Sequence, residues 1–242
     1  MLRIFRNIRQ KLAAENKVMA YLRYAIGEIL LVVIGILIAL QINNWNEQRK
    51  YRNLEITMLA EIKTSLEESL FEINNLIQRN GEYIEYYKTL LVYINNHLPY
   101  DKTLEGCFGS LEFWESPYFN YSAFETLKTL GAELISNDNL KKRIIRMYDK
   151  DLKFLVDDYD KSEWNYSTGV VHPFFSKHIE RVVNTKKAIP NNYSELMKNA
   201  EFKNILTALI VMRSNGIKFS QDLKLSLENL IEDISKEIEK QN

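Results

Sequence analysis

Apolar residues follow helical spacing over most of this chain. An unbroken apolar stretch occupies residues 25–42, with the sequence AIGEILLVVIGILIALQI. Beyond it, apolar residues recur at steps of three, four and seven, which is the period of one helix face. These steps predict long helices over about 47–98, 138–166 and 199–240. Because an alternating strand pattern never persists for more than a few residues, the sequence predicts an all-α fold.

The connections between these helices are predicted from turn residues. The break at 99–120 contains two prolines, and Ser122 then starts a short helix through a capping box with Glu125. A second interruption is expected at Gly169 and Pro173, followed by a short helix over 174–183. We therefore predict an elongated extramembrane helical bundle with a coiled-coil-like stripe, whose long helices run up, down and up. Its first helix would continue the membrane segment as a stalk.

The apolar stretch has the length and composition of a transmembrane helix, which we place at residues 24–43. Eighteen residues rise roughly 27 Å, close to the thickness of the hydrocarbon layer. Twelve of them are Leu, Ile or Val, which together favour insertion by about 4–7 kcal/mol, against up to about 3 kcal/mol for Glu28. Tyr24 and Trp45 bracket the segment as interface anchors.

Two alternatives to a membrane anchor are less consistent with the sequence. A cleaved signal peptide would need small residues at cleavage spacing, but Leu40 is followed by Gln-Ile-Asn-Asn-Trp. A buried core helix would have a polar side, whereas 29–40 is apolar all round.

Charge predicts the topology of the chain. Residues 1–23 carry six basic side chains and one acidic side chain, so this tail is expected to stay in the cytoplasm. The tail either lies on the inner leaflet as a short amphipathic helix or is a disordered basic segment. The main domain, 44–242, is then expected on the other side of the membrane; if the cell is Gram-negative, the chain is a bacterial inner-membrane protein with a periplasmic domain.

The remaining composition excludes some classes of partner. From position 43 onward there are 26 basic and 30 acidic residues, so the domain is mildly acidic. A nucleic-acid-binding surface would need a clustered basic excess. The lone Cys107 has no partner for an internal disulfide.

Two stretches resemble a known family. One is YAIGEILLVVIGILIALQINNWNEQRK, residues 24–50, and the other is Ser122–Tyr148, with FETLK at 124–128 and Gly131. They resemble a bacterial membrane-protein family catalogued as domain of unknown function 6090. The resemblance implies a single-span protein of Gram-negative bacteria with no established activity, and it assigns chemistry to no residue.

The membrane segment contains four candidate helix-contact residues, Gly27, Glu28, Gly35 and Ala39. Small residues four apart allow two helices to approach closely, so a homo-oligomer or a contact with another membrane protein is possible here. Glu28 is an ionisable group inside an apolar span, which makes it a candidate for proton transfer. It lies only one turn from the segment's start, so it could instead reach the interface or pair with a neighbouring helix.

An aromatic segment, FWESPYFNYSAF at 113–124, is expected at the tip of the bundle. Aromatic side chains either seal the end of a bundle or anchor a partner. The residues of the possible partner patch are Phe113, Trp114, Tyr118, Phe119 and Tyr121.

No catalytic motif is evident. His97, His172 and His178 are scattered and match no compact metal pattern, and no glycine loop of phosphate-binding type occurs. We therefore expect no cofactor and no enzymatic activity. The favoured hypothesis is a membrane-anchored helical scaffold or sensor-like module, with the lipid bilayer as one partner. The alternative is an accessory subunit of an ion-driven or transport complex that uses Glu28.

Overall fold

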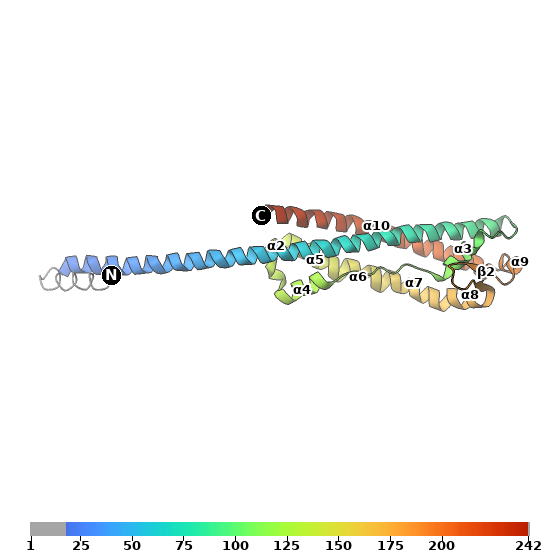
Figure 1. Ribbon diagram of the computed structural model, residues 1–242, viewed down its shortest axis with the longest axis horizontal. Coiled ribbons are helices and arrows are strands. Elements are labelled where there is room, and N and C mark those ends of the chain that lie inside the picture. Colours follow the sequence, from blue (N-terminus) through green and yellow to red (C-terminus); the bar gives the residue numbers. More distant parts are fainter. Residues whose placement is uncertain (1–17, 242) are drawn as a thin grey trace. The chain divides into compact units, whose positions relative to one another are not determined.

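The computed structural model describes residues 18–241, so residues 1–17 of the predicted basic tail lie outside the described part. The chain divides into two compact units, Met1–Leu54 and Glu55–Asn242. One long helix, α2 (Val18–Asn95), contributes its first part to the first unit and its second part to the second unit (Figure 1). This long apolar N-terminal helix, followed by further helices, confirms the all-α prediction.

The second unit contains short and long helices and one small hairpin after α2. In chain order these are α3 (Leu104–Gly109), η1 (Ser110–Glu112), α4 (Ser122–Leu130), η2 (Ala132–Leu134), α5 (Asp138–Arg146), η3 (Met147–Asp151), α6 (Leu152–Phe154), η4 (Leu155–Asp160), α7 (Lys161–Tyr166), η5 (Ser167–Val171), α8 (His172–His178), β1 (Ile179–Arg181), β2 (Ala188–Pro190), α9 (Tyr193–Leu196) and α10 (Ala200–Gln241). Here η1 and η2 are 3₁₀-helices, whereas η3, η4 and η5 are π-helices.

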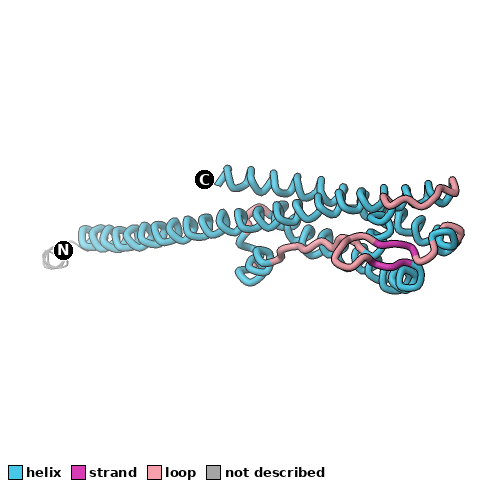
Figure 2. Tube along the Cα trace, turned by 45° about the vertical axis from the view of Figure 1, so that its right-hand side comes forward, coloured by secondary structure: helices cyan, strands magenta, loops and turns pink. Residues whose placement is uncertain are grey.

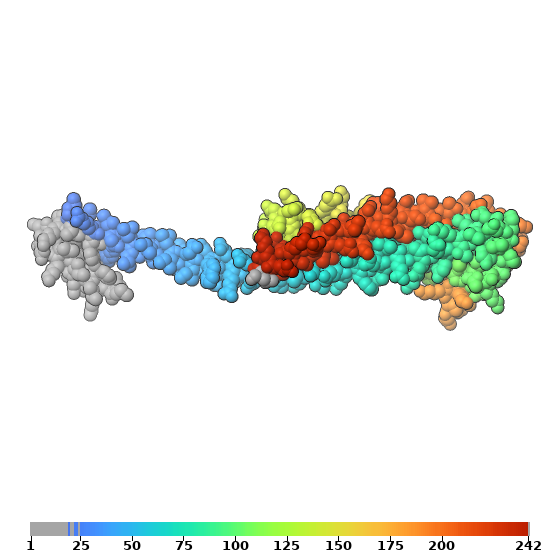
Figure 3. All heavy atoms as spheres, turned by 90° about the horizontal axis from the view of Figure 1, so that it is seen from above, coloured from blue at the N-terminus to red at the C-terminus, as the bar shows by residue number. Residues whose placement is uncertain are grey.

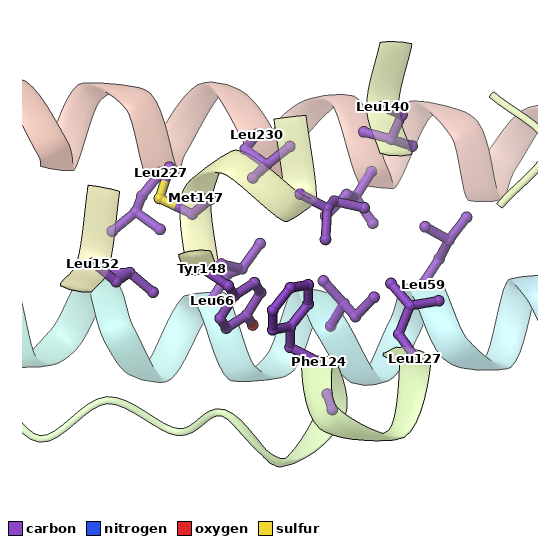
Figure 4. Packing of buried hydrophobic residues seen from close by; sticks show 14 of the residues in the cluster. Leu59, Leu66, Phe124, Leu127, Leu140, Met147, Tyr148, Leu152, Leu227 and Leu230 are labelled. Atoms are coloured by element: carbon purple, nitrogen blue, oxygen red, sulfur yellow. The ribbon is translucent and has the colours of Figure 1, made fainter. Parts of the chain in front are cut away.

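Two separate hydrophobic clusters form the core of the second unit. The first core cluster joins residues 58–76 of α2, the aromatic side chains of α4 and η3, and residues 223–234 of α10. In its centre the rings of Phe124 and Tyr148 stack 4.6 Å apart, close to Leu66 (Figure 4). The second core cluster joins residues 87–94 of α2 to α3, α8 and the start of α10, with Phe108 and Phe202 stacked in it.

The order of residues in these clusters corrects the predicted path of the chain. Residue numbers increase from the first core cluster to the second along α2 and along the run from α5 to α8, but decrease along α10. The long helical runs therefore go up, up and down, rather than up, down and up. The prediction had the second long helix bring the chain back along the bundle. Residues 113–121 do this instead, as an extended segment that leads back to α4 (Figures 1 and 2). In Figure 3, α10 lies beside the 55–95 part of α2.

The helix predicted over 174–183 is wrong in its second half. Helix α8 ends at His178, and β1 pairs antiparallel with β2, with Ile179 opposite Pro190 (Figure 2). The hairpin lies close to α3, because a Cβ placed on Gly109 would be 2.0 Å from the carbonyl oxygen of Lys186. Only a residue without a side chain allows this approach.

The predicted break at Gly169 and Pro173 is also wrong. The helical run continues from Asp138 to His178 through the π-helix η5, and Pro173 stands in the first turn of α8. A proline at this position removes a backbone N–H that a locally wider helix turn does not use.

The short helix α4 does not begin with the predicted capping box. Its first backbone N–H, that of Ser122, donates to Oδ1 of Asn120 at 2.9 Å, and no bond from the Ser122 hydroxyl caps the helix. Gly131 ends it with φ of 98°, a conformation that favours glycine. Asn137 caps the next helix by accepting from two backbone N–H groups of its first turn.

Candidate functional site

The first unit presents its apolar segment entirely at the surface. Of the most apolar 18-residue window in α2, no part is buried within the chain. Side chains such as Ile29 and Leu31 expose more than 60% of their area. The core helix of a water-soluble domain would bury this face, so the observation is compatible with a membrane anchor.

The predicted membrane-contact residues lie in this exposed stretch. Gly27, Gly35 and Ala39 are exposed, and a Cβ added to either glycine would meet no atom within 4 Å. Glu28 is half-buried. Trp45 exposes 64% of its area, whereas the side chain of Tyr24 lies outside the described part. The helix contacts predicted for these residues stay predictions.

The five residues of the predicted partner patch do not form one exposed cluster. They lie on the extended segment 113–121, which runs beside the bundle and not across its tip (Figure 1). Phe119 and Tyr121 pack against the first core cluster. Trp114 lies edge-on to Trp164 at 5.5 Å, and Phe113 lies under a guanidinium group. Only Tyr118 is largely exposed.

A mostly buried polar layer lies where the two core clusters meet, and it includes Tyr87 of the second core cluster. Sequence reasoning missed this layer. Its members are Asn80, Tyr83 and Tyr87 of α2, Tyr159 of η4, Glu163 of α7, and Arg213 and Ser220 of α10. Arg213 exposes 1% of its area and Glu163 2%, so two ionisable side chains are buried together. Such burial requires close pairing.

Arg213 is held by groups from three elements. One terminal nitrogen donates to the Tyr87 hydroxyl, and the other donates to the carbonyl oxygen of Phe113 at 2.6 Å. The guanidinium also lies over the ring of Tyr83 at 4.8 Å and that of Tyr87 at 5.0 Å. Its Nε lies 3.6 Å from Oε1 of Glu163. The charge is thus shared between a carboxylate, two aromatic faces and two oxygens.

Glu163 is reached by a short hydrogen-bond chain. The Tyr159 hydroxyl donates to Oε1 of Glu163 at 2.9 Å, and Nδ2 of Asn80 donates to the Tyr159 oxygen at 3.1 Å. Burial raises the pKa of the Glu163 carboxyl, while Arg213 and the Tyr159 hydroxyl act in the opposite direction. Burial likewise raises the pKa of Tyr159 and of Tyr87. Tyr83, which donates to Glu115, has its pKa raised by burial to about 12.

Several polar atoms of this layer have no hydrogen-bond partner in the described structure. They are Oδ1 of Asn80, Nε of Arg213 and the hydroxyl of Ser220, together with the hydroxyl of Ser167 one turn beyond Glu163. Buried polar groups normally have partners, and each one left without a partner carries a desolvation cost.

Wider, π-helical turns occur at the level of this polar layer. The run from α5 to α8 contains the π-helices η3, η4 and η5, and both Tyr159 and Ser167 lie in such wider turns. Tyr159 passes close to α10, because a Cβ on Gly216 would lie 2.2 Å from its ring. Wider turns of this kind are frequent at functional sites.

The described residues hold their candidate metal ligands and nucleophile apart from one another. Among them, no group of three His, Cys, Asp or Glu side chains is arranged to hold a metal ion. Cys107 is buried, and burial raises the pKa of its thiol, which lowers its nucleophilicity. His178 lies against the ring of Phe174 at 4.5 Å, and Nε2 of His172 is buried without a partner.

The fold and these sites define an all-α chain with a helical unit that contains a buried charged layer, and residues 18–241 include one candidate membrane helix. Residues 28–94 match the model of a family of unknown function, DUF6090. This match confirms the family resemblance at the membrane segment and extends along α2. It ends before Ser122–Tyr148, where the resemblance stays a prediction. No curated protein and no solved structure matches the chain.

Proposed function

We propose that this chain is a single-span membrane protein whose helical unit is a non-enzymatic interaction module, serving as a scaffold or a sensor. The observation that carries this proposal is the apolar surface of residues 25–42. Eighteen residues of helix with no buried part would expose a large apolar area to water, and a bilayer removes that cost. In this topology the basic tail is cytoplasmic and the helical unit is periplasmic.

The burial of the charged layer supports an interaction role over catalysis. A catalytic group must touch its substrate, but Arg213 and Glu163 are covered almost completely by helices. A buried charge pair does fix which turns of the helices face each other, because a shifted register would leave each charge unpaired. The helical unit would therefore present a defined surface to a partner.

Crosslinking in living cells tests the interaction role. Single photo-crosslinking residues at exposed positions of the second unit, for example at Lys88 or Ser226, should capture the same protein repeatedly, or a second copy of this chain. A matched residue at Lys50 near the membrane serves as the control for random collisions. A chain that is strictly monomeric in detergent and captures nothing from any position would contradict the proposal.

One substitution distinguishes the alternative role, an accessory subunit that uses Glu28, from the scaffold or sensor role. Glu28→Gln keeps the shape of the side chain and removes its charge, so a proton-carrying subunit would lose activity while it still assembled. A scaffold or sensor should assemble and crosslink as before. Loss of partner function in intact complexes with Glu28→Gln would favour the accessory-subunit role.

A further inference from the structure

An open groove lies between α2 and the extended segment that leads to α4. Its volume is about 530 Å³, and it is lined by α2 residues 64–72 together with Tyr118 and Asn120. A second depression of about 300 Å³ continues it toward Glu61 and Thr126, and the two share Thr64, Glu68 and Asn120. The two depressions therefore form one groove along the side of the second unit.

Two exposed aromatic rings stand at one end of this groove. Phe71 exposes 64% of its area and Tyr118 exposes 82%. Aromatic rings of this size are normally placed where they lose contact with water, and adjacent exposed rings are typical of interaction surfaces. Phe71 belongs to α2 and Tyr118 to the extended segment, so the sequence alone did not place the two rings together.

The fold holds Tyr118 outward. On one side of it, the Ser116 hydroxyl donates to Asp160 at 2.7 Å and Pro117 is buried. On the other side, the Ser65 hydroxyl donates to the carbonyl oxygen of Asn120, and Nδ2 of Asn120 donates to Glu68 at 2.9 Å. Because the backbone is held by hydrogen bonds on both sides of Tyr118, little conformational entropy is lost when a partner contacts the ring.

The groove is negatively charged. Glu67, Glu68 and Glu72 line its aromatic end and Glu61 lines its continuation, while no lining residue is basic. One of these acids pairs with a lysine, because Nζ of Lys63 lies 3.8 Å from Oε1 of Glu67. Four carboxylates with one lysine leave a local excess of negative charge beside the two rings.

From this combination, the geometry points to a docking site for a positively charged peptide segment of a partner protein, with Arg or Lys side chains on the carboxylates and over the rings. Guanidinium and ammonium groups bind both to carboxylates and to aromatic faces, so one partner chemistry satisfies both features of the groove. This inference rests on the proposed role as an interaction module and names the chemistry of its partner.

The test measures binding of a synthetic peptide to the full chain in neutral maltoside micelles. The probe is a fluorescein-labelled dodecapeptide of alternating Arg and Ser. Its binding is measured by fluorescence anisotropy at 50 and 300 mM NaCl. We expect saturable binding that weakens at least tenfold at the higher salt, because exposed charges are screened over about 10 Å at 0.1 M salt. The same peptide with Glu in place of Arg should not bind.

Variants locate the binding. Glu67→Gln/Glu72→Gln should weaken binding about tenfold, whereas Glu85→Gln/Glu228→Gln, with the same change in net charge elsewhere on the unit, should change it less than twofold. Tyr118→Ser should weaken it at least fivefold, and an unchanged near-ultraviolet circular dichroism spectrum shows that the variant is folded.

Three outcomes would overturn the inference. They are absence of saturable binding, an equal loss in the control pair, and self-association of the free chain that Tyr118→Ser abolishes, which would assign the groove to a second copy. None of these outcomes contradicts the interaction role, because the crosslinking test also accepts a second copy of this chain, so the two proposals fail separately.

Discussion

Substituting Arg213 by Met tests the buried charged layer most sharply. Met keeps an unbranched apolar side chain of similar length but removes the cation, leaving Glu163, which exposes 2% of its area, without its charged partner. The carbonyl oxygen of Phe113 also loses its donor. Removing one partner of a buried pair costs about 3–5 kcal/mol. With a denaturant slope of about 2 kcal/mol per molar urea, the unfolding midpoint should fall by about 1.5–2.5 M.

The effect should depend on pH in a defined direction. Burial already raises the pKa of the Glu163 carboxyl above its ordinary value of 4.5, and Arg213 opposes that rise. In Arg213→Met the folded-state pKa therefore rises further, so the folded state binds more protons than the unfolded state above pH 4.5. The stability contribution is present at low pH and is lost as pH rises through the folded-state pKa. The loss caused by Arg213→Met should be larger at pH 8 than at pH 5.

A second substitution provides the internal control. In Arg213→Met/Glu163→Gln no unpaired carboxylate is left, so the double variant should recover at least half of the stability lost in Arg213→Met. Glu163→Gln alone should cost less than Arg213→Met, because Arg213 keeps the Tyr87 hydroxyl and the two aromatic faces. The assay is urea unfolding of the full chain in maltoside micelles, followed by tryptophan fluorescence. A cost below about 1 kcal/mol at both pH values, or a double variant less stable than Arg213→Met, would refute this reasoning.

Two further predictions concern packing. Gly216→Ala should lower the urea midpoint, with a cost of about 1–3 kcal/mol, because its Cβ would lie 2.2 Å from the Tyr159 ring, whereas the matched Gly81→Ala, with open space around it, should raise stability by about 0.5–1 kcal/mol. Shifts of the same sign in both variants would contradict the close approach. Cys107 should react with a maleimide at pH 7.5 at least 100-fold more slowly in the folded protein than in 8 M urea, because its thiol is buried and its pKa is raised. Rapid labelling of the folded chain would count against that burial.

The long helices were predictable because their information is local. The apolar stripe of α2 and of α10 repeats with the helical period, and Gly131 and Asn137 mark a helix end and a helix start by their own chemistry. The direction of the helical run from α5 to α8 could not be predicted from its own residues. It depends on residues 113–121 returning in an extended form, and such a segment has no period that a sequence pattern can reveal.

The charged layer is indicated in the sequence by the spacing of buried positions along α10. The positions Leu206, Leu209, Arg213, Gly216, Ser220, Leu223 and Leu227 follow one another at alternating steps of three and four, and all of them are buried. The apolar residue in this interval, Ile217, is only half-buried, whereas the three polar or small positions are buried. Strict spacing would have placed Arg213 in the core, but its partner Glu163 lies on another helix and only the three-dimensional structure identifies it.

The most direct test of a lipid-embedded apolar segment is extraction of cell membranes with alkaline carbonate. Peripheral proteins are released by this treatment, whereas a chain with residues 25–42 in the bilayer should stay in the membrane pellet and be released only by detergent. A version lacking residues 25–42 should appear in the soluble fraction and retain its helical circular dichroism spectrum. Release of the full chain into the carbonate supernatant would contradict the membrane anchor and, with it, the topology proposed for the helical unit.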